Sequence, residues 1–167
     1  PETCIACHPD QAADAFHSVH YQLSGPTPNV PNIPGEAGKL NKGFNTYCGS
    51  PVSSRQYACS GCHVSYGKKP STEMTPEQLS NIDCLMCHQD QYQRKPAGPF
   101  ETVSYTDYLG VEHSWQLPIE NELGEFAYTP DEGKMNISIL EAARTVHLPT
   151  RASCLRCHAY AAGSNCG

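Results

Sequence analysis

The stretch CLMCH at residues 84–88 has a pattern that occurs four times in the chain: two cysteines separated by two residues, followed directly by a histidine. The other copies are CIACH at residues 4–8, CSGCH at 59–63 and CLRCH at 154–158. The segments between successive copies are 50, 20 and 65 residues long, so the chain is not an even repeat. These four motifs, called motifs 1 to 4 in chain order, hold eight of the ten cysteines.

The C-x-x-C-H pattern is typical of covalent haem attachment. Two cysteines three positions apart lie on one helical turn, so both can form thioethers with the vinyl groups of one porphyrin. The histidine that follows then reaches the iron as its proximal ligand. The motifs therefore predict four haem c groups, each with its iron. The predicted attachment residues are Cys4, Cys7, Cys59, Cys62, Cys84, Cys87, Cys154 and Cys157, and the predicted proximal ligands are His8, His63, His88 and His158.

Two other interpretations use the same cysteines. The cysteines of motifs 2 and 3 form C-x₂-C-x₂₁-C-x₂-C, near the spacing of a zinc ribbon. A C-x-x-C pair can also be a redox-active dithiol. Neither interpretation explains why a histidine follows all four pairs, and we therefore prefer haem.

The composition predicts a fold with little conventional core. About 41 % of the 167 residues are apolar when glycine is counted and tyrosine is not, below the roughly 45–50 % usual for soluble domains. Fourteen prolines and thirteen glycines disfavour long helices and strands. We expect residues 1–167 to form a single tetrahaem domain that is mostly α with extensive irregular loops. The macrocycles should pack where a core would lie, with at most a small β hairpin, and folding should largely require the cofactor.

Four histidines remain outside the motifs, one for each predicted haem. They are His17, His20, His113 and His147. The simplest assignment makes each of them a distal ligand, so that every haem is bis-histidine. Ordinary surface histidines are the alternative. Met74, Met86 and Met135 are weaker candidates for the same role. A six-coordinate iron has no open position for a substrate, so this ligand set predicts an electron relay rather than an enzyme.

The segment DQAADAFHSVHY at residues 10–21 has apolar residues at helical spacing. On one helix, His17 and His20 would emerge from the same side. The two axial ligands of one haem approach opposite faces of the ring, so these histidines should serve two different haems.

Two capping boxes predict where other helices begin. Thr75 and Gln78 should start a helix that carries Cys84 to His88. Ser138 and Glu141 should start a helix with His147 in its last turn.

The remaining segments give weaker signals. FETVSYTDY at residues 100–108 predicts a strand or a hairpin before His113 and Trp115. Residues 24–56 are rich in turn-forming residues and should form an irregular ordered loop around a haem. Cys48 and Cys166, outside the motifs, suggest a disulfide in an oxidising compartment; unpaired thiols or bonds to other chains are the alternatives.

Charge and hydropathy limit the partners. The net charge of −6 argues against nucleic acid. No apolar stretch approaches the roughly 18 residues of a membrane span. No signal peptide is recognised, so we expect Pro1 to be a mature or trimmed N-terminus.

Four stretches resemble known multihaem cytochromes c: SVHYQLSGPTPNV (18–30), CHVSYGKKP (62–70), TPEQLSNIDCLMCH (75–88) and PTRASCLRCHAYAAG (149–163). They are similar to octahaem cytochromes of the tetrathionate-reductase type and to the tetrahaem subunits of extracellular cytochrome filaments. The resemblance implies an extracytoplasmic location, either periplasmic or in an extracellular filament. The octahaem enzymes have about twice as many haems and a lysine-ligated catalytic haem, and no C-x-x-C-K occurs in this chain.

The resemblance also suggests how the protein works. We expect an electron-transfer protein that repeats as a homo-oligomeric filament, with haem-to-haem contacts between subunits. Its partners would be redox proteins or extracellular electron acceptors. The filament resemblance implies that one distal histidine is donated across a subunit boundary, with His17 or His20 as the candidate. The alternatives are a soluble periplasmic carrier, or a reductase of sulfur or nitrogen oxyanions with one open haem.

Overall fold

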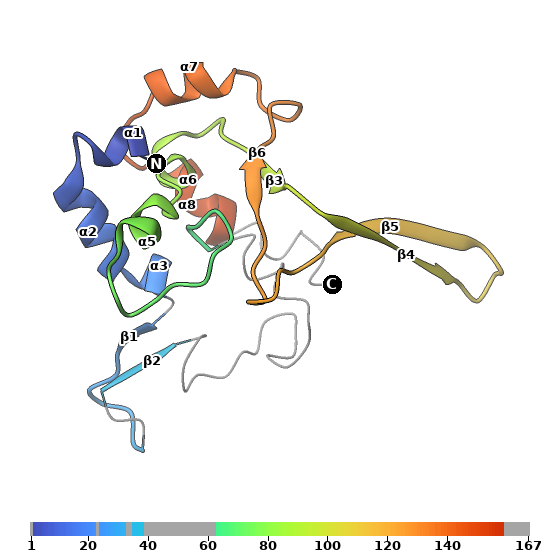
Figure 1. Cartoon of the computed structure of the whole chain (residues 1–167), viewed down its shortest axis with the longest axis horizontal. Coiled ribbons are helices and arrows are strands. Elements are labelled where there is room, and N and C mark those ends of the chain that lie inside the picture. Colours follow the sequence, from blue (N-terminus) through green and yellow to red (C-terminus); the bar gives the residue numbers. More distant parts are fainter. Residues whose placement is uncertain (1, 23, 33–34, 39–62, 159–167) are drawn as a thin grey trace.

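The computed structural model describes residues 2–22, 24–32, 35–38 and 63–158 (Figure 1). The helices are α1 (Glu2–Ile5), α2 (Pro9–His17), α3 (Val19–Gln22), α5 (Pro76–Ser80), α6 (Leu85–His88), α7 (Ile139–Arg144) and α8 (Arg151–His158). The strands are β1 (Ser24–Pro26), β2 (Glu36–Gly38), β3 (Arg94–Pro96), β4 (Phe100–Thr106), β5 (Glu112–Pro118) and β6 (Tyr128–Pro130). Four of the cysteines with predicted roles lie outside the described residues, namely Cys48, Cys59, Cys62 and Cys166.

The strands of the described residues form three antiparallel pairs, β1–β2, β3–β6 and β4–β5. The prediction of at most one small hairpin is therefore wrong. Two pairs join consecutive strands, β1–β2 and β4–β5, and β3 and β6 also pair across more than 30 residues of sequence. The long hairpin β4–β5 confirms the strand predicted at residue 100. His113 and Trp115 lie on its second strand instead of following it. Figure 1 shows this hairpin extending away from the helices.

The predicted helix over residues 10–21 is divided in two at Ser18. The backbone of Ser18 is extended, with φ −72° and ψ 154°. Its hydroxyl donates to the Ala15 carbonyl oxygen at 2.6 Å, which satisfies a carbonyl at the end of α2. His17 is therefore the last residue of α2, whereas His20 belongs to α3.

Both capping boxes start helices as predicted, but the helices end early. The Thr75 hydroxyl accepts the Gln78 N–H and the Ser138 hydroxyl accepts the Glu141 N–H, each at 3.2 Å. Helix α5 ends at Ser80, so motif 3 begins a separate helix, α6. Helix α7 ends at Arg144, three residues before His147. The hydroxyl of the next residue, Thr145, donates back to the Glu141 carbonyl oxygen at 2.8 Å and completes this end.

Replacing Ser138 by alanine should lower the free energy of unfolding by about 1 kcal/mol, because the Glu141 N–H would lose its acceptor. Denaturant unfolding of the haem-loaded protein measures the change. Ser114→Ala, on the exposed strand β5, is the matched control and should stay within about 0.5 kcal/mol of the original chain. Equal effects of the two substitutions would contradict the capping role.

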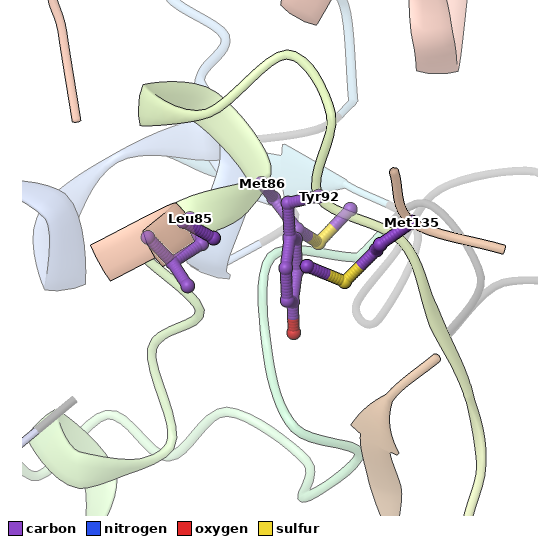
Figure 2. Packing of buried hydrophobic residues seen from close by; sticks show 5 residues of the cluster. Leu85, Met86, Tyr92 and Met135 are labelled. Carbon is purple, nitrogen blue, oxygen red and sulfur yellow. The ribbon is translucent and has the colours of Figure 1, made fainter. Parts of the chain in front are cut away.

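Eight of the buried apolar residues form two small clusters beside motif 3. One contains Phe16, Tyr21 and Ile82. The other contains Leu85, Met86, Tyr92, Met135 and Ala142. Figure 2 shows Met86 and Met135 beside the Tyr92 ring, so both methionines belong to the packing of this cluster. Among the described residues just ten apolar side chains are buried, in agreement with the thin core that the composition predicts.

Candidate haem-attachment site

In the three motifs that the structure describes in full, the backbone forms the helical turn that two thioethers to one porphyrin require. In motif 1 the N–H groups of Cys7 and His8 donate to the Cys4 carbonyl oxygen at 3.1 and 2.9 Å. In motif 3 the same two bonds run from Cys87 and His88 to Cys84 at 3.3 and 3.1 Å. Motif 4 lies within α8. A helical turn thus places both cysteines of each of these motifs on one side, as predicted.

Three motifs come together in space, with motif 3 in the middle. The Cys84 thiol lies close enough to Cys4 in motif 1 for the two thiols to interact electrostatically. Cys87 lies close enough to Cys154 in motif 4 for their thiols to interact electrostatically. Motif 3 therefore lies between motif 1 and motif 4, with one of its cysteines nearer to each.

Arg156, between the two cysteines of motif 4, fixes α8 against the segment after motif 3. Its guanidinium donates to the carbonyl oxygens of Tyr92, Gln89 and Asp90 at 2.7, 3.0 and 2.8 Å. Sequence reasoning missed this role. The only sign in the sequence was the arginine itself. Haem attachment requires no particular residue between the two cysteines of the motif, so a basic side chain there could have another role.

His88 has the protonation pattern of a histidine that binds a metal through Nε2. Its Nδ1 lies 2.9 Å from the His147 carbonyl oxygen, and the His147 N–H donates to the His88 carbonyl oxygen at 3.0 Å. A carbonyl accepts only from a protonated Nδ1, so Nε2 keeps its lone pair for iron. His147 resembles it in part: its Nδ1 donates to the Leu148 carbonyl oxygen at 2.8 Å, but its Nε2 lies 3.8 Å from the Asp90 carboxylate.

His63, the predicted proximal ligand of motif 2, is held differently. Its Nε2 lies 2.5 Å from the Tyr21 carbonyl oxygen, and its Nδ1 lies 2.8 Å from the Ser65 hydroxyl. The ring is buried, and burial lowers its pKa. The proton thus sits on Nε2 and faces a carbonyl, so iron binding at this atom requires the hydrogen bond to Tyr21 to be broken. The proximal role of His63 therefore stays a prediction, and it requires the ring to exchange Tyr21 for iron.

A buried charged network joins motifs 2 and 3. The Arg94 guanidinium lies 3.2 Å from the Asp83 carboxylate, and both side chains are almost fully buried. Arg94 also donates to the carbonyl oxygens of His63, at 2.6 Å, and Ser65. The Tyr92 hydroxyl donates to Asp83 at 3.0 Å. Burial raises the pKa of Asp83, although Arg94 acts in the opposite direction. One indication of this network is visible in the sequence, because Asp83 directly precedes the first cysteine of motif 3.

The other predicted ligands are spread over two regions. His8, His17, His20 and His158 are exposed. The rings of His20 and His158 lie near each other, with centroids 6.3 Å apart. His113 instead lies on the projecting hairpin, where its Nε2 is 2.8 Å from the Asp107 carboxylate and its ring stacks on Tyr105 (Figure 1).

The thiols of motif 3 argue against a redox-active dithiol. Burial raises the pKa of Cys84 to about 11 and also raises the pKa of Cys87. Redox-active cysteines function as thiolates, which need a lowered pKa. Within the described ranges, no group of three or more histidine, cysteine or acidic side chains is arranged to hold a metal ion.

Comparison with known proteins agrees with this chemistry. The family model for cytochrome c554 and c-prime matches residues 3–89, more than half of the chain, so the chain belongs to this family. An uncharacterized protein of Archaeoglobus fulgidus is 30 % identical over 196 residues, which cover 97 % of this chain and 60 % of that protein. The octahaem cytochrome c of Shewanella oneidensis has a similar fold, with a TM-score of 0.55 and 24 % identity over 94 % of this chain and 28 % of that one.

The protein is thus a multihaem c-type cytochrome that resembles the octahaem cytochromes. Membership of this family implies that the chain carries haem c with its iron. The chain spans less than two thirds of the relative's length and little more than a quarter of the octahaem protein's. In the described part of the chain, no helix is long and apolar enough to cross a membrane.

Proposed function

We propose that the chain binds four bis-histidine haems, which relay electrons, and that it repeats as a subunit of an extracellular filament. The bound haems supply the reversible one-electron chemistry. The observation that carries the relay is the position of motif 3, since α6 packs against α8, which holds motif 4, and Cys84 interacts electrostatically with Cys4 of motif 1. Attachment points this close keep successive macrocycles near each other. Electrons then pass to redox proteins or extracellular acceptors.

The chain's own residues hold the relay in place. The carbonyl of His147 orients the His88 ring, and Arg156 fixes motif 4 against the segment that follows motif 3. In this proposal the distal ligands are His17, His20, His113 and His147, as the tally of histidines predicts. The proposed Cys48–Cys166 disulfide would add a covalent constraint.

The hairpin β4–β5 supports the filament part of the proposal. It extends away from the helices (Figure 1), and at its turn Tyr108 and Leu109 are 94 % and 71 % exposed. Exposed apolar groups of this kind favour burial against another protein surface. A second copy of the chain is the proposed surface, and the hairpin would bring it His113 as a distal ligand. His113 is thus a better candidate than His17 or His20 for donation across a subunit boundary.

One observation favours the alternative of a reductase. His113 already holds Asp107 through its Nε2, which is the atom that would bind iron. If His113 keeps this partner, one haem lacks a distal ligand and can bind an oxyanion of sulfur or nitrogen. The two functions differ in the spin state of that haem, which is low-spin in the relay and high-spin in the reductase.

His113→Ala tests the proposal. In the native protein we expect purely low-spin haem by EPR and filaments in negative-stain microscopy. In the variant we expect one high-spin haem in four and loss of filaments, because one iron loses its distal ligand. Glu101→Ala, on the same hairpin, is the control and should change neither property.

Three outcomes would overturn parts of the proposal. High-spin haem in the native protein would favour the reductase. A monodisperse low-spin monomer would indicate a soluble periplasmic carrier. A mass spectrum without four covalent haems would refute the tetrahaem relay itself.

A further inference from the structure

His20 and His158 form a ring pair unlike the others in the described residues. Their centroids are 6.3 Å apart and their planes are at 89°. The other aromatic ring pairs have centroids 5.0 to 5.5 Å apart, as expected for direct contact. Neither imidazole forms a hydrogen bond with another described residue, and both residues are exposed. The pair is therefore close but not in direct stacking contact.

The separation matches two imidazoles on opposite sides of one iron. A ring nitrogen lies about 1.2 Å from the imidazole centroid and a metal–imidazole bond is about 2.0 Å long, which gives centroids about 6.4 Å apart. Perpendicular planes are compatible with this arrangement, since each ring can rotate about its bond to the metal. We propose that His20 is the distal ligand of the haem whose proximal ligand is His158.

Contacts that do not involve the haem hold both ligands at this separation. Next to His20, the buried Tyr21 side chain donates from its hydroxyl to the Gln78 side chain at 2.7 Å and accepts from Asn81 at 3.1 Å. Next to His158, Arg156 binds three carbonyl oxygens after motif 3. The segment from Gln78 to Tyr92 thus anchors both ligands, so the polypeptide itself sets the space between the rings.

The break at Ser18 separates His20 from His17. His17 ends α2, and its ring contacts the adjacent Phe16 edge-on at 5.0 Å. His20 lies on α3, whose direction is set by the buried Tyr21. The pairing therefore assigns one of the two neighbouring histidines to motif 4 and leaves His17 for another haem.

This inference rests on the proposed haem relay, and ligand replacement tests it. His20→Met should keep four covalent haems by mass, give one of them the long-wavelength absorption band of methionine-ligated ferric haem, and raise its potential. The native protein should also show the highly anisotropic low-spin EPR signal of perpendicular imidazoles. His20→Met should remove this signal, whereas the control His17→Met should retain it.

A second background assigns the affected haem to its motif. In the variant Cys154→Ala/Cys157→Ala/His158→Ala, which lacks the fourth haem, His20→Met should produce no methionine band, while His17→Met should still produce one. A methionine band from His20→Met in this background would overturn the pairing. Absence of haem from the native protein would instead refute the proposed relay, so the two failures are distinguishable.

Discussion

The double replacement Cys84→Ala/Cys87→Ala should abolish the cooperative unfolding transition of the protein and leave a protease-sensitive chain. Motif 3 lies between motifs 1 and 4, because α6 packs against α8 and Cys84 interacts electrostatically with Cys4. Leu85 and Met86, between the cysteines, belong to one of the two small clusters that form the core. Without the covalent haem, too little apolar surface remains to offset the conformational entropy of the chain. Circular dichroism and limited proteolysis measure the loss.

The matched control is Cys4→Ala/Cys7→Ala in motif 1. Helix α1 has no buried residue, and Cys7 is exposed. Loss of this haem should leave a three-haem protein, verified by mass spectrometry, with a helical signal close to that of the original chain. If both double variants unfold to the same extent, motif 3 has no central role in the fold.

Local sequence signals predicted where helices begin but not where they end. The Ser138 cap depends on a side chain three residues from its partner, and such a pattern is visible in the sequence. The end of α2 depends instead on the Ser18 hydroxyl, which can either face water or take the Ala15 carbonyl. The pairing of β3 with β6 depends on distant segments, so no local pattern indicates it.

The candidate site was predictable to the extent that it is encoded in the motifs. The C-x-x-C-H pattern has a fixed chemical meaning, and the family match confirms haem c. The residues that position the motifs were not predictable, because arginine side chains such as Arg156 act through backbone carbonyls of distant residues. His113 shows the same limit. Counting the histidines outside the motifs predicts that His113 is a haem ligand. Its position on a projecting hairpin, beside Asp107, depends on the three-dimensional fold and could not be predicted by that count.

Replacing Arg94 by methionine should destabilise the protein by about 3–5 kcal/mol at neutral pH, because Asp83 would become a buried charge without its cation. The Arg94 side chain is 6 % exposed and that of Asp83 is 0 % exposed, so water cannot replace the lost partner. The variant also loses the hydrogen bonds to the carbonyl oxygens of His63 and Ser65, which connect motif 2 to motif 3. Denaturant unfolding followed by circular dichroism measures the change. The control is Lys95→Met, which removes a cation 54 % exposed and 3.4 Å from Asp131, and should cost less than about 1 kcal/mol.

The pH dependence separates this electrostatic cost from a packing defect. Burial raises the pKa of Asp83 in the folded protein, and removing Arg94 takes away the interaction that opposes this rise. The folded variant therefore binds a proton more tightly than the unfolded chain, so its stability falls as the pH rises from the ordinary pKa of aspartate to the raised value. The deficit relative to the original chain should shrink in acid, where Asp83 is neutral in both states. Asp83→Asn combined with Arg94→Met should likewise recover part of the loss at neutral pH. A deficit that stays constant with pH and does not change in the double variant would mean that Arg94 acts through packing alone.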